Sequence, residues 1–257
     1  MKKIINLLFI IVLIVLGVSY FIRKDYKSVK DINPNVIIGP IQTDLEDKKP
    51  INFVKDGYSY SLTPKFNYEF NGLVVHTMNY DVWYSLSRSD KVFPLDICAV
   101  WGNSVSNKAY SDKSLRFSQD MRFCYIEWGS GIRIQLDEFS NNHLLTNDDK
   151  IKEKFKSIFP GDQIKIKGKL ADVKAQLVGA GKKYESNGFT MATSTVRSDT
   201  DAGACEIIYV EDVEILKKGH LLAQQIFEIS YYTLIGIIIF RIIYFFFRVF
   251  YPRKYDY

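Results

Sequence analysis

Two long apolar stretches lie near the ends of this chain. The first, residues 4–22, contains no charged residue, and the second, residues 229–247, is interrupted only by Arg241. Because a helix needs about 20 apolar residues to cross a bilayer, we expect residues 1–24 and 220–248 to form transmembrane helices. A cleaved signal peptide is the alternative for the first stretch, although its hydrophobic region usually has only about 7 to 15 residues.

Positively charged residues beside these stretches predict their orientation. Lys2 and Lys3 precede the first stretch, and three basic residues follow the second: Arg248, Arg253 and Lys254. Basic residues favour the cytoplasmic side of a membrane, so we expect both ends of the chain inside and the segment between the helices exported. Residues 249–257 are then a cytoplasmic tail. Arg241 is interpreted as extending to the nearer interface, with a functional arginine inside the membrane as the alternative.

Between the two helices, a polar segment is followed by an alternating pattern. Residues 25–57 are interrupted by Pro34, Pro40 and Pro50, which predicts an extended linker. Within residues 161–170, Ile164 and Ile166 alternate with polar residues, as in a strand with one buried face. The lysines of that strand are expected to be solvated or to protect a sheet edge: Lys165, Lys167 and Lys169. We assign residues 58–219 to one exported β domain.

Other parts of this domain predict one helix and several strands. Apolar residues spaced i, i+4, i+7 and i+8 predict a helix over residues 148–159, with Thr146 and Asn147 as caps. Residues 104–120 and 140–143 are polar and are expected to be loops. The predicted strands are a long one over 66–75, bent at Gly72, and shorter ones over 97–101, 123–128, 132–136 and 204–216, with 123–128 and 132–136 as a hairpin.

The order of these elements resembles that of an OB-fold. The resemblance covers roughly residues 66–216 and rests on a long bent strand, two more strands, a helix, a further strand and a final strand. It implies a mainly β domain, a Greek-key barrel with one soluble helix between its third and fourth strands. An antiparallel β-sandwich is the alternative, because insertions at 83–93 and 180–201 interrupt a simple five-stranded barrel.

The charge distribution argues against a nucleic-acid partner. The chain has a formal net charge of +5. From Asp25 to His220, however, 26 Lys and Arg residues face 27 Asp and Glu residues, so the positive excess lies in the two ends. A protein that binds nucleic acid without sequence preference needs a cationic face to replace the counterions of the phosphates. We therefore expect the exported domain to bind no nucleic acid.

The densest group of polar residues lies between Thr193 and Glu206. We predict a binding site there, formed by four residues at the mouth of the barrel: Arg197, Asp199, Asp201 and Glu206. A solvated loop held by an Arg–Asp pair is the alternative. The spacing does not match a calcium loop, and the chain has no nucleophile elbow or phosphate loop. We predict no catalytic residue and no cofactor, and an enzyme is less expected than a binding protein.

The cysteines and histidines offer few further candidates. Cys98 and Cys124 lie in successive predicted strands, and an exported domain permits a disulfide between them. Cys205 is then a buried residue or an intermolecular partner, and three reduced cysteines are the alternative. The three histidines are far apart, and His143 is interpreted as a structural loop residue. We therefore predict no metal site.

Several short segments are similar to those of an uncharacterised group of bacterial envelope membrane proteins. They are residues 96–102 (DICAVWG), 141–145 (NNHLL), 197–199 (RSD) and 203–206 (GACE). The similarity implies a bacterial envelope setting and assigns no functional residue. Together with the two helices, it predicts a two-span inner-membrane protein whose exported domain binds an envelope protein or acts as a scaffold. The alternative is an envelope enzyme, or a domain that binds a small ligand or ion through residues 197–206.

Overall fold

The computed structural model divides the chain into two compact units. It describes residues 2–82, 91–131, 134–179, 187–196, 198–199 and 204–250. Met1–Asp25 and His220–Tyr257 form one unit, and Tyr26–Gly219 forms the other. The second unit is mainly β and carries the buried core, and the first consists of two long helices. The candidate chemistry of the chain therefore lies in the second unit.

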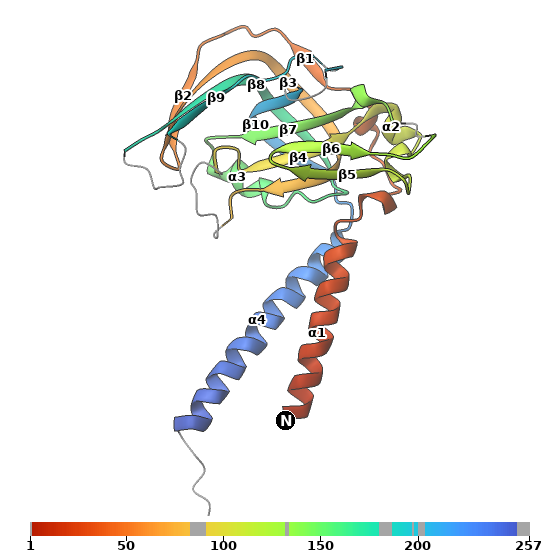
Figure 1. Ribbon diagram of the computed structural model, residues 1–257, viewed down its shortest axis with the longest axis vertical. Helices are drawn as coiled ribbons and strands as arrows, with labels where there is room; N and C mark the ends of the chain where they lie inside the picture. The colour runs from red at the N-terminus through yellow and green to blue at the C-terminus, as the bar shows by residue number, and fades with distance from the viewer. Residues whose placement is uncertain are drawn as a thin grey trace, which may run out of the picture. The chain divides into compact units, whose positions relative to one another are not determined.

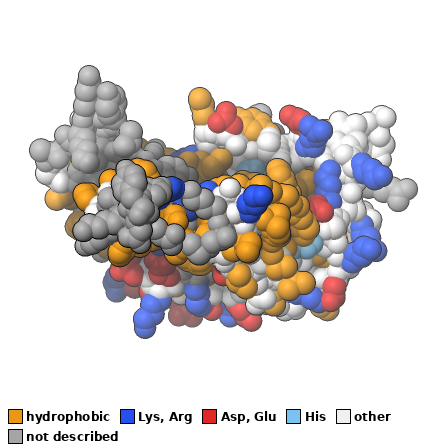
Figure 2. Space-filling model, turned by 90° about the horizontal axis from the view of Figure 1, so that it is seen from below, with side chains coloured by type: hydrophobic (Ala, Val, Ile, Leu, Met, Phe, Trp, Pro, Cys, Tyr) orange, Lys and Arg blue, Asp and Glu red, His pale blue; other side chains and the backbone are white. Residues whose placement is uncertain are grey.

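The first unit pairs α1 (Lys2–Ile22) with α4 (Leu221–Phe250), which lie side by side (Figure 1). Both helices are long and apolar enough to cross a membrane. Most of their large apolar side chains are exposed, and Figure 2 shows hydrophobic side chains gathered on the surface of the molecule. Such extensive apolar surface is costly in water and is what a helix facing lipid requires.

Arg241 has a partner within this helix pair. Its Nη2 donates a hydrogen bond of 2.7 Å to Oδ1 of Asn6, and its guanidinium lies 4.5 Å from the centre of the Phe9 ring. Asn6 is about one turn from Lys2 and Lys3, near the charged end of α1. The expected interfacial position of Arg241 therefore stays a prediction, and the structure adds Asn6 as a hydrogen-bond partner of its guanidinium.

The second unit contains one large mixed sheet and a separate hairpin. Its strands are β1 (Ile41–Thr43), β2 (Ile51–Lys55), β3 (Tyr58–Asn79), β4 (Leu95–Val100), β5 (Arg116–Asp120), β6 (Phe123–Glu127), β7 (Phe139–Leu145), β8 (Gln163–Leu177), β9 (Gly188–Met191) and β10 (Cys205–Lys217). Its helices are α2 (Gly102–Ser106) and α3 (Asp149–Phe155), with 3₁₀ turns η1 (Tyr26–Ser28), η2 (Pro34–Ile37), η4 (Ala109–Ser111) and η5 (Leu136–Glu138). Strands β5 and β6 form the hairpin, which contacts β3 and β7 (Figure 1).

Five strands of the large sheet are joined in a closed cycle of pairings. The order is β3, β4, β7, β10 and β8, and β8 pairs again with β3. All of these pairs are antiparallel except β7–β10, which is parallel. The largest apolar cluster includes residues from all five strands and from α3. Gly168 on β8 lets β10 approach closely, because a Cβ there would collide with the carbonyl of Tyr209, beside a register shift in β10.

Strand β8 is not an edge strand, which corrects one expectation about its lysines. It lies between β3 and β10, and its lysines form ion pairs with carboxylates on these neighbours. Lys165 and Lys167 lie 2.5 and 3.5 Å from the carboxylate of Glu69, and Lys169 pairs with Glu211. Cross-strand pairs of opposite charge stabilise a sheet. The lysines therefore contribute to strand pairing rather than protecting an edge.

The segment expected to be an extended linker packs against the domain instead. It contains η1, η2, β1 and β2, and the last two strands pair with β3. Val29 and Val36 are buried in an apolar cluster that also contains Phe117 of strand β5. The prolines were a misleading signal, because Pro34 begins the 3₁₀ turn η2, where a proline needs no N–H partner.

Both loop predictions and the hairpin prediction were also wrong in part. Residues 104–120 contain part of α2, all of η4 and all of β5, and β6 pairs with β5. Of the segment 132–136 that was expected to pair with β6, residues 132 and 133 lie outside the described residues. The connecting turn consists of Met121 and Arg122, both with positive φ, which is the geometry of a tight hairpin turn. Helix α3 is shorter than predicted, and its N-cap is Asp148, whose carboxylate accepts from the N–H of Lys150.

A buried ion pair holds α3 to the loops around it. Nζ of Lys152 lies 2.8 Å from Oδ2 of Asp56 and 3.4 Å from Oδ2 of Asp81. Burial lowers the pKa of Lys152, but the two carboxylates outweigh this effect and raise it overall. The lysine therefore stays charged, and its positive charge interacts with the carboxylates of both Asp56 and Asp81.

The chain enters and leaves the β domain at neighbouring points. Asp162 is fully buried and accepts hydrogen bonds of 3.0 Å from the N–H of Gly219 and from Nζ of Lys218. The next residue, Gln163, accepts from the N–H of Asn33 (2.6 Å) and donates to the carbonyl of Asp31 (2.8 Å). Two consecutive side chains thus fix both ends of the domain.

Candidate functional site

Three neighbouring strands place polar and sulfur-containing side chains on one face of the sheet. In the pairing of β4 with β7, Asp96 is opposite His143 and Cys98 is opposite Asn141. In the pairing of β7 with β10, Asn141 is opposite Cys205. Alternate residues of a strand share a face, so all five side chains lie on the same face.

This face is turned away from the largest apolar cluster. The residues that alternate with the polar ones, Ile97, Leu144 and Ile208, belong to the core enclosed by the cycle of strands. The polar face is nevertheless buried, because the β5–β6 hairpin and the segment before β4 cover it. Its charged groups therefore interact in an environment with little water, where electrostatic interactions are strong.

At the centre of the face, a buried carboxylate is paired with two basic side chains. Asp96 is 0% exposed and His143 is 1% exposed. Nδ1 of His143 lies 3.0 Å from Oδ1 of Asp96, and Nη1 of Arg122 lies 3.2 Å from Oδ2. Arg122 comes from the β5–β6 turn, also donates to the carbonyl of Phe93 (3.3 Å), and lies 3.8 Å above the Tyr80 ring. Arg122 has a positive φ, as does Met121 before it in the same turn.

The environment of His143 favours its protonated form. Burial lowers the pKa of the imidazole, but the interactions with Asp96 and with Cys205 raise it more, to about 9. At neutral pH, the histidine is therefore an imidazolium. The pKa also indicates that the ring interacts with the thiol of Cys205 on β10 as well as with the carboxylate on β4.

All three cysteines lie around one asparagine. Cys98 and Cys124 form a disulfide that joins β4 to β6, with Cα atoms 6.0 Å apart. Cys205 is free and buried. Nδ2 of Asn141 lies 3.1 Å from the sulfur of Cys205, and its Oδ1 lies 3.2 Å from the sulfur of Cys124. One amide side chain thus separates a thiol from a disulfide.

A hollow of about 540 Å³ opens directly over these residues. Its floor includes Asn141 and Cys205, and Asp199 lies at its wall. The remaining walls are largely apolar and come from β6 and the residues that follow it: Phe123, Cys124, Tyr125, Ile126, Trp128, Leu136 and Phe139. Tyr125 and Trp128 are about half exposed, at 47% and 50%. An apolar hollow with a few polar groups at its base is the usual form of a binding site.

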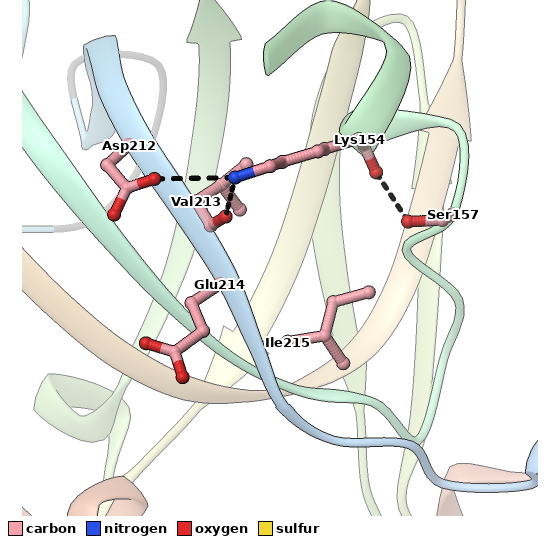
Figure 3. Close-up of a pocket in the computed structure, with 6 residues that line it drawn as sticks. All are labelled: Lys154, Ser157, Asp212, Val213, Glu214 and Ile215. Atoms are coloured by element: carbon pink, nitrogen blue, oxygen red, sulfur yellow. Dashed lines mark hydrogen bonds and ion pairs between the residues drawn. The ribbon is translucent and has the colours of Figure 1, made fainter. Parts of the chain in front are cut away.

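A second hollow, of about 430 Å³, lies between α3 and β10 (Figure 3). Nζ of Lys154 reaches across it to the carbonyl of Val213 (3.0 Å) and to Oδ1 of Asp212 (3.5 Å). Ser157 donates to the carbonyl of Lys154 at 2.7 Å. In Figure 3, Lys154 and Ser157 are thus directed at groups of the protein itself, whereas Glu214 is drawn without an interaction. It is the weaker of the two candidates.

No family model, curated protein or solved structure matches this chain. The similarity to envelope proteins therefore stays a prediction. The function has to be inferred from the residues of the site themselves.

The structure brings together only part of the predicted binding site. Asp199 lies in the wall of the first hollow and accepts a hydrogen bond from Oγ of Ser194. Glu206 is buried on β10 beside Cys205, and successive strand residues point to opposite faces, so Glu206 points away from that hollow. Arg197 and Asp201 lie outside the described residues. Among the described residues, no group of His, Cys, Asp and Glu is arranged to hold a metal ion.

Sequence reasoning missed the central Asp96–His143 pair because it placed His143 in a loop. Residues 140–143 are in fact the middle of β7, and they are buried despite being polar. Their hydrogen bonds replace the water contacts that they lose, as between Nδ2 of Asn142 and Oγ of Ser140 at 2.7 Å. The one usable signal was Asp96, a charged residue at the start of an otherwise apolar strand.

Proposed function

We propose that this chain is a two-span protein of a bacterial inner membrane whose exported β domain binds a protein partner in an envelope assembly. Two flanking helices that could each span a membrane support a membrane location. The basic residues near the outer ends of both helices support cytoplasmic termini and an exported domain. A reporter fused after Tyr257 tests this orientation, and activity only outside the cytoplasm would overturn it.

We propose further that the exported domain is an OB-like barrel. The closed cycle of β3, β4, β7, β10 and β8 supports this, as does the position of α3 between its third and fourth strands. The parallel pair β7–β10 argues against the alternative, a sandwich made only of antiparallel strands. The hairpin β5–β6 is then an insertion between the second and third strands of the barrel.

The observation that carries partner binding is the aromatic hollow over β7 and β10. Tyr125 and Trp128 are about half exposed beside a hollow of about 540 Å³. Aromatic side chains at a concave, apolar surface are typical of the residues that dominate protein–protein affinity. Because the walls of the hollow are largely apolar, we expect an apolar side chain of a protein partner to occupy it. Binding is favourable because filling the hollow removes apolar surface from water.

Crosslinking in the native membrane tests this binding site. A photoreactive residue at position 125 of the full-length chain should capture the partner, which mass spectrometry identifies. Trp128→Ala should reduce capture by roughly 30-fold, the effect of losing about 2 kcal/mol at a dominant interface residue. Val54→Ala is the control, because Val54 is 67% exposed on β2 and does not line the hollow. Equal capture by the wild type and Trp128→Ala would refute the site.

Binding of a small ligand or ion is the second candidate, because Asp199 lines the same hollow. In this alternative, Arg197 and Asp201 act with Asp199, and the domain is an envelope enzyme or a ligand-binding module. Replacing Asp199 and Asp201 with Ala separates the two functions. Loss of a co-purifying ion or ligand with capture retained would favour the ligand site, and unchanged capture with no bound ligand in either protein supports partner binding.

A further inference from the structure

A free thiol and one cysteine of a disulfide line the hollow, and the His143–Asp96 ion pair lies on the same face of the sheet. Cys205 lies beside Asn141, and both line the hollow together with Cys124 of the Cys98–Cys124 bond. His143 follows Asn141 by two residues on the same face of β7, and Asp96 is directly opposite His143. A thiol, an imidazole and a carboxylate thus occupy three adjacent strands. Nothing in partner binding requires this arrangement.

We propose that Cys205 is a thiol nucleophile, placed beside the His143–Asp96 pair, whose substrate is the Cys98–Cys124 disulfide. A cysteine close to a positively charged histidine is a recurring arrangement of reactive thiols. Here, the ion pair between Nδ1 of His143 and Asp96, 3.0 Å long, fixes the ring.

The chemistry is an exchange and needs no external oxidant or reductant. Cys205 reacts as its thiolate, which attacks the sulfur of Cys124. A bond forms between Cys205 and Cys124, the bond between Cys124 and Cys98 breaks, and Cys98 leaves as a thiolate. The leaving thiolate takes up the proton that Cys205 released. The numbers of disulfides, thiols and protons are the same before and after.

Two polar groups accompany Cys205 on this face of the sheet. Nδ2 of Asn141 lies 3.1 Å from its sulfur, and His143 carries a positive charge on the same face. A hydrogen-bond donor and a cation are groups that stabilise a thiolate. The charged groups that face His143 are Asp96 from β4, Arg122 from the β5–β6 turn and Cys205 from β10. Arg122 adds a second positive charge next to Asp96.

The exchange has a structural consequence for the hollow. Cys124 belongs to β6 and Cys205 to β10, and the two residues form part of its lining. A disulfide requires Cα atoms about 4.4–6.8 Å apart, so a Cys124–Cys205 bond draws β6 towards β10. Because β5 and β6 form a sheet of their own, the hairpin can move without breaking pairs in the large sheet. The exchange therefore narrows the hollow, and it makes partner binding depend on which disulfide is present.

A thiol titration of the purified full-length chain tests the proximity of the two sulfurs. Cys98→Ser leaves Cys124 and Cys205 as the only thiols. One equivalent of the aromatic disulfide DTNB should release two equivalents of its chromophoric thiol, because the first labelled cysteine is attacked by the second. The control Cys98→Ser, Cys205→Ser should release one equivalent. The proposal is wrong if Cys98→Ser also releases only one equivalent of the chromophoric thiol, while excess DTNB labels both Cys124 and Cys205.

The role of His143 is tested by the rate of the second release. Adding His143→Gln to the Cys98→Ser chain should slow that step roughly 100-fold, because a neutral amide replaces the positive charge on the face that holds Cys205. It should also remove the change of rate with pH around the pKa of His143. An equal rate and an equal pH profile in both chains would show that His143 does not assist.

Disulfide mapping of the unmodified chain provides a test that no substitution can disturb. The wild-type protein is incubated with a trace of reduced glutathione, quenched with acid, alkylated and digested. A peptide linking Cys124 to Cys205 should appear beside the Cys98–Cys124 peptide, and its absence at every pH would overturn the proposal. Because these measurements use the purified chain without a partner, they stand or fall separately from capture at the aromatic hollow.

Discussion

His143→Gln offers the sharpest test of the buried polar face. The pKa of His143 is raised from 6.5 to about 9, so its proton is bound more tightly in the folded domain than in the unfolded chain. A group of this kind stabilises the fold fully below its unfolded pKa, and the contribution is lost as pH rises through the folded pKa. The loss should therefore fall between pH about 6.5 and about 9.

The size of the effect follows from the shift. A shift of about 2.5 units at about 1.4 kcal/mol per unit corresponds to roughly 3 kcal/mol of unfolding free energy. We expect the wild type to be more stable than His143→Gln by about this amount at pH 6. At pH 9.5 the difference should nearly vanish, because the wild-type imidazole is then mostly neutral.

Urea unfolding in detergent, followed by tryptophan fluorescence, measures this difference. All three tryptophans, Trp83, Trp101 and Trp128, lie outside α1 and α4, so the signal reports the β domain. His76→Gln is the control, because Nδ1 of His76 lies 3.3 Å from a neutral amide, that of Gln119. A difference between the wild type and His143→Gln that stays constant from pH 6 to 9.5 would refute the pairing with Asp96.

Two further substitutions test how the domain is held together. Lys152→Ala removes the cation shared by two carboxylates and should lower the free energy of unfolding, measured in urea, by about 2 kcal/mol. This loss is smaller than that for a fully buried ion pair, because the side chain of Asp56 is 32% exposed. A cost below about 0.5 kcal/mol would show that the ion pair contributes little. Gly168→Ala should cost about 1–3 kcal/mol through overpacking against β10, whereas Gly39→Ala, where the nearest atom is 3.8 Å away, should cost far less. Equal effects of the two glycine substitutions would contradict the close approach of β8 and β10.

The elements that the sequence predicted are those with a clear hydrophobic period. Uninterrupted apolar stretches marked both long helices, and alternation in residues 161–170 marked β8. The strand predicted over 204–216 is β10, which has neighbours on both sides. In each case, burial of apolar side chains against water fixes the structure, and a local pattern is enough to detect it.

The missed elements depend on partners that are distant in sequence. Strand β7 reads as a loop, since residues 140–143 are polar and gain their stability from hydrogen bonds and from Asp96, 47 positions before His143. Strand β5 was missed because the turn at Met121 and Arg122 contains no glycine or asparagine. The candidate site combines both failures, as it is formed by β7, by Arg122 and by the hairpin that the turn creates.

The side chains of Asp162 and Gln163 hold residues near the start and at the end of the β domain close together. They hold Gly219 at the exit and Asn33 at the entrance through side-chain hydrogen bonds. Tension applied between these two ends is borne first by those few bonds, and not by the long ladders of the sheet. A small pulling force should then break these hydrogen bonds and separate the two ends of the domain, while the barrel and the hollow stay intact. In evolutionary terms, the same feature makes the domain an exchangeable insert between two helices, since such inserts need ends that lie close together.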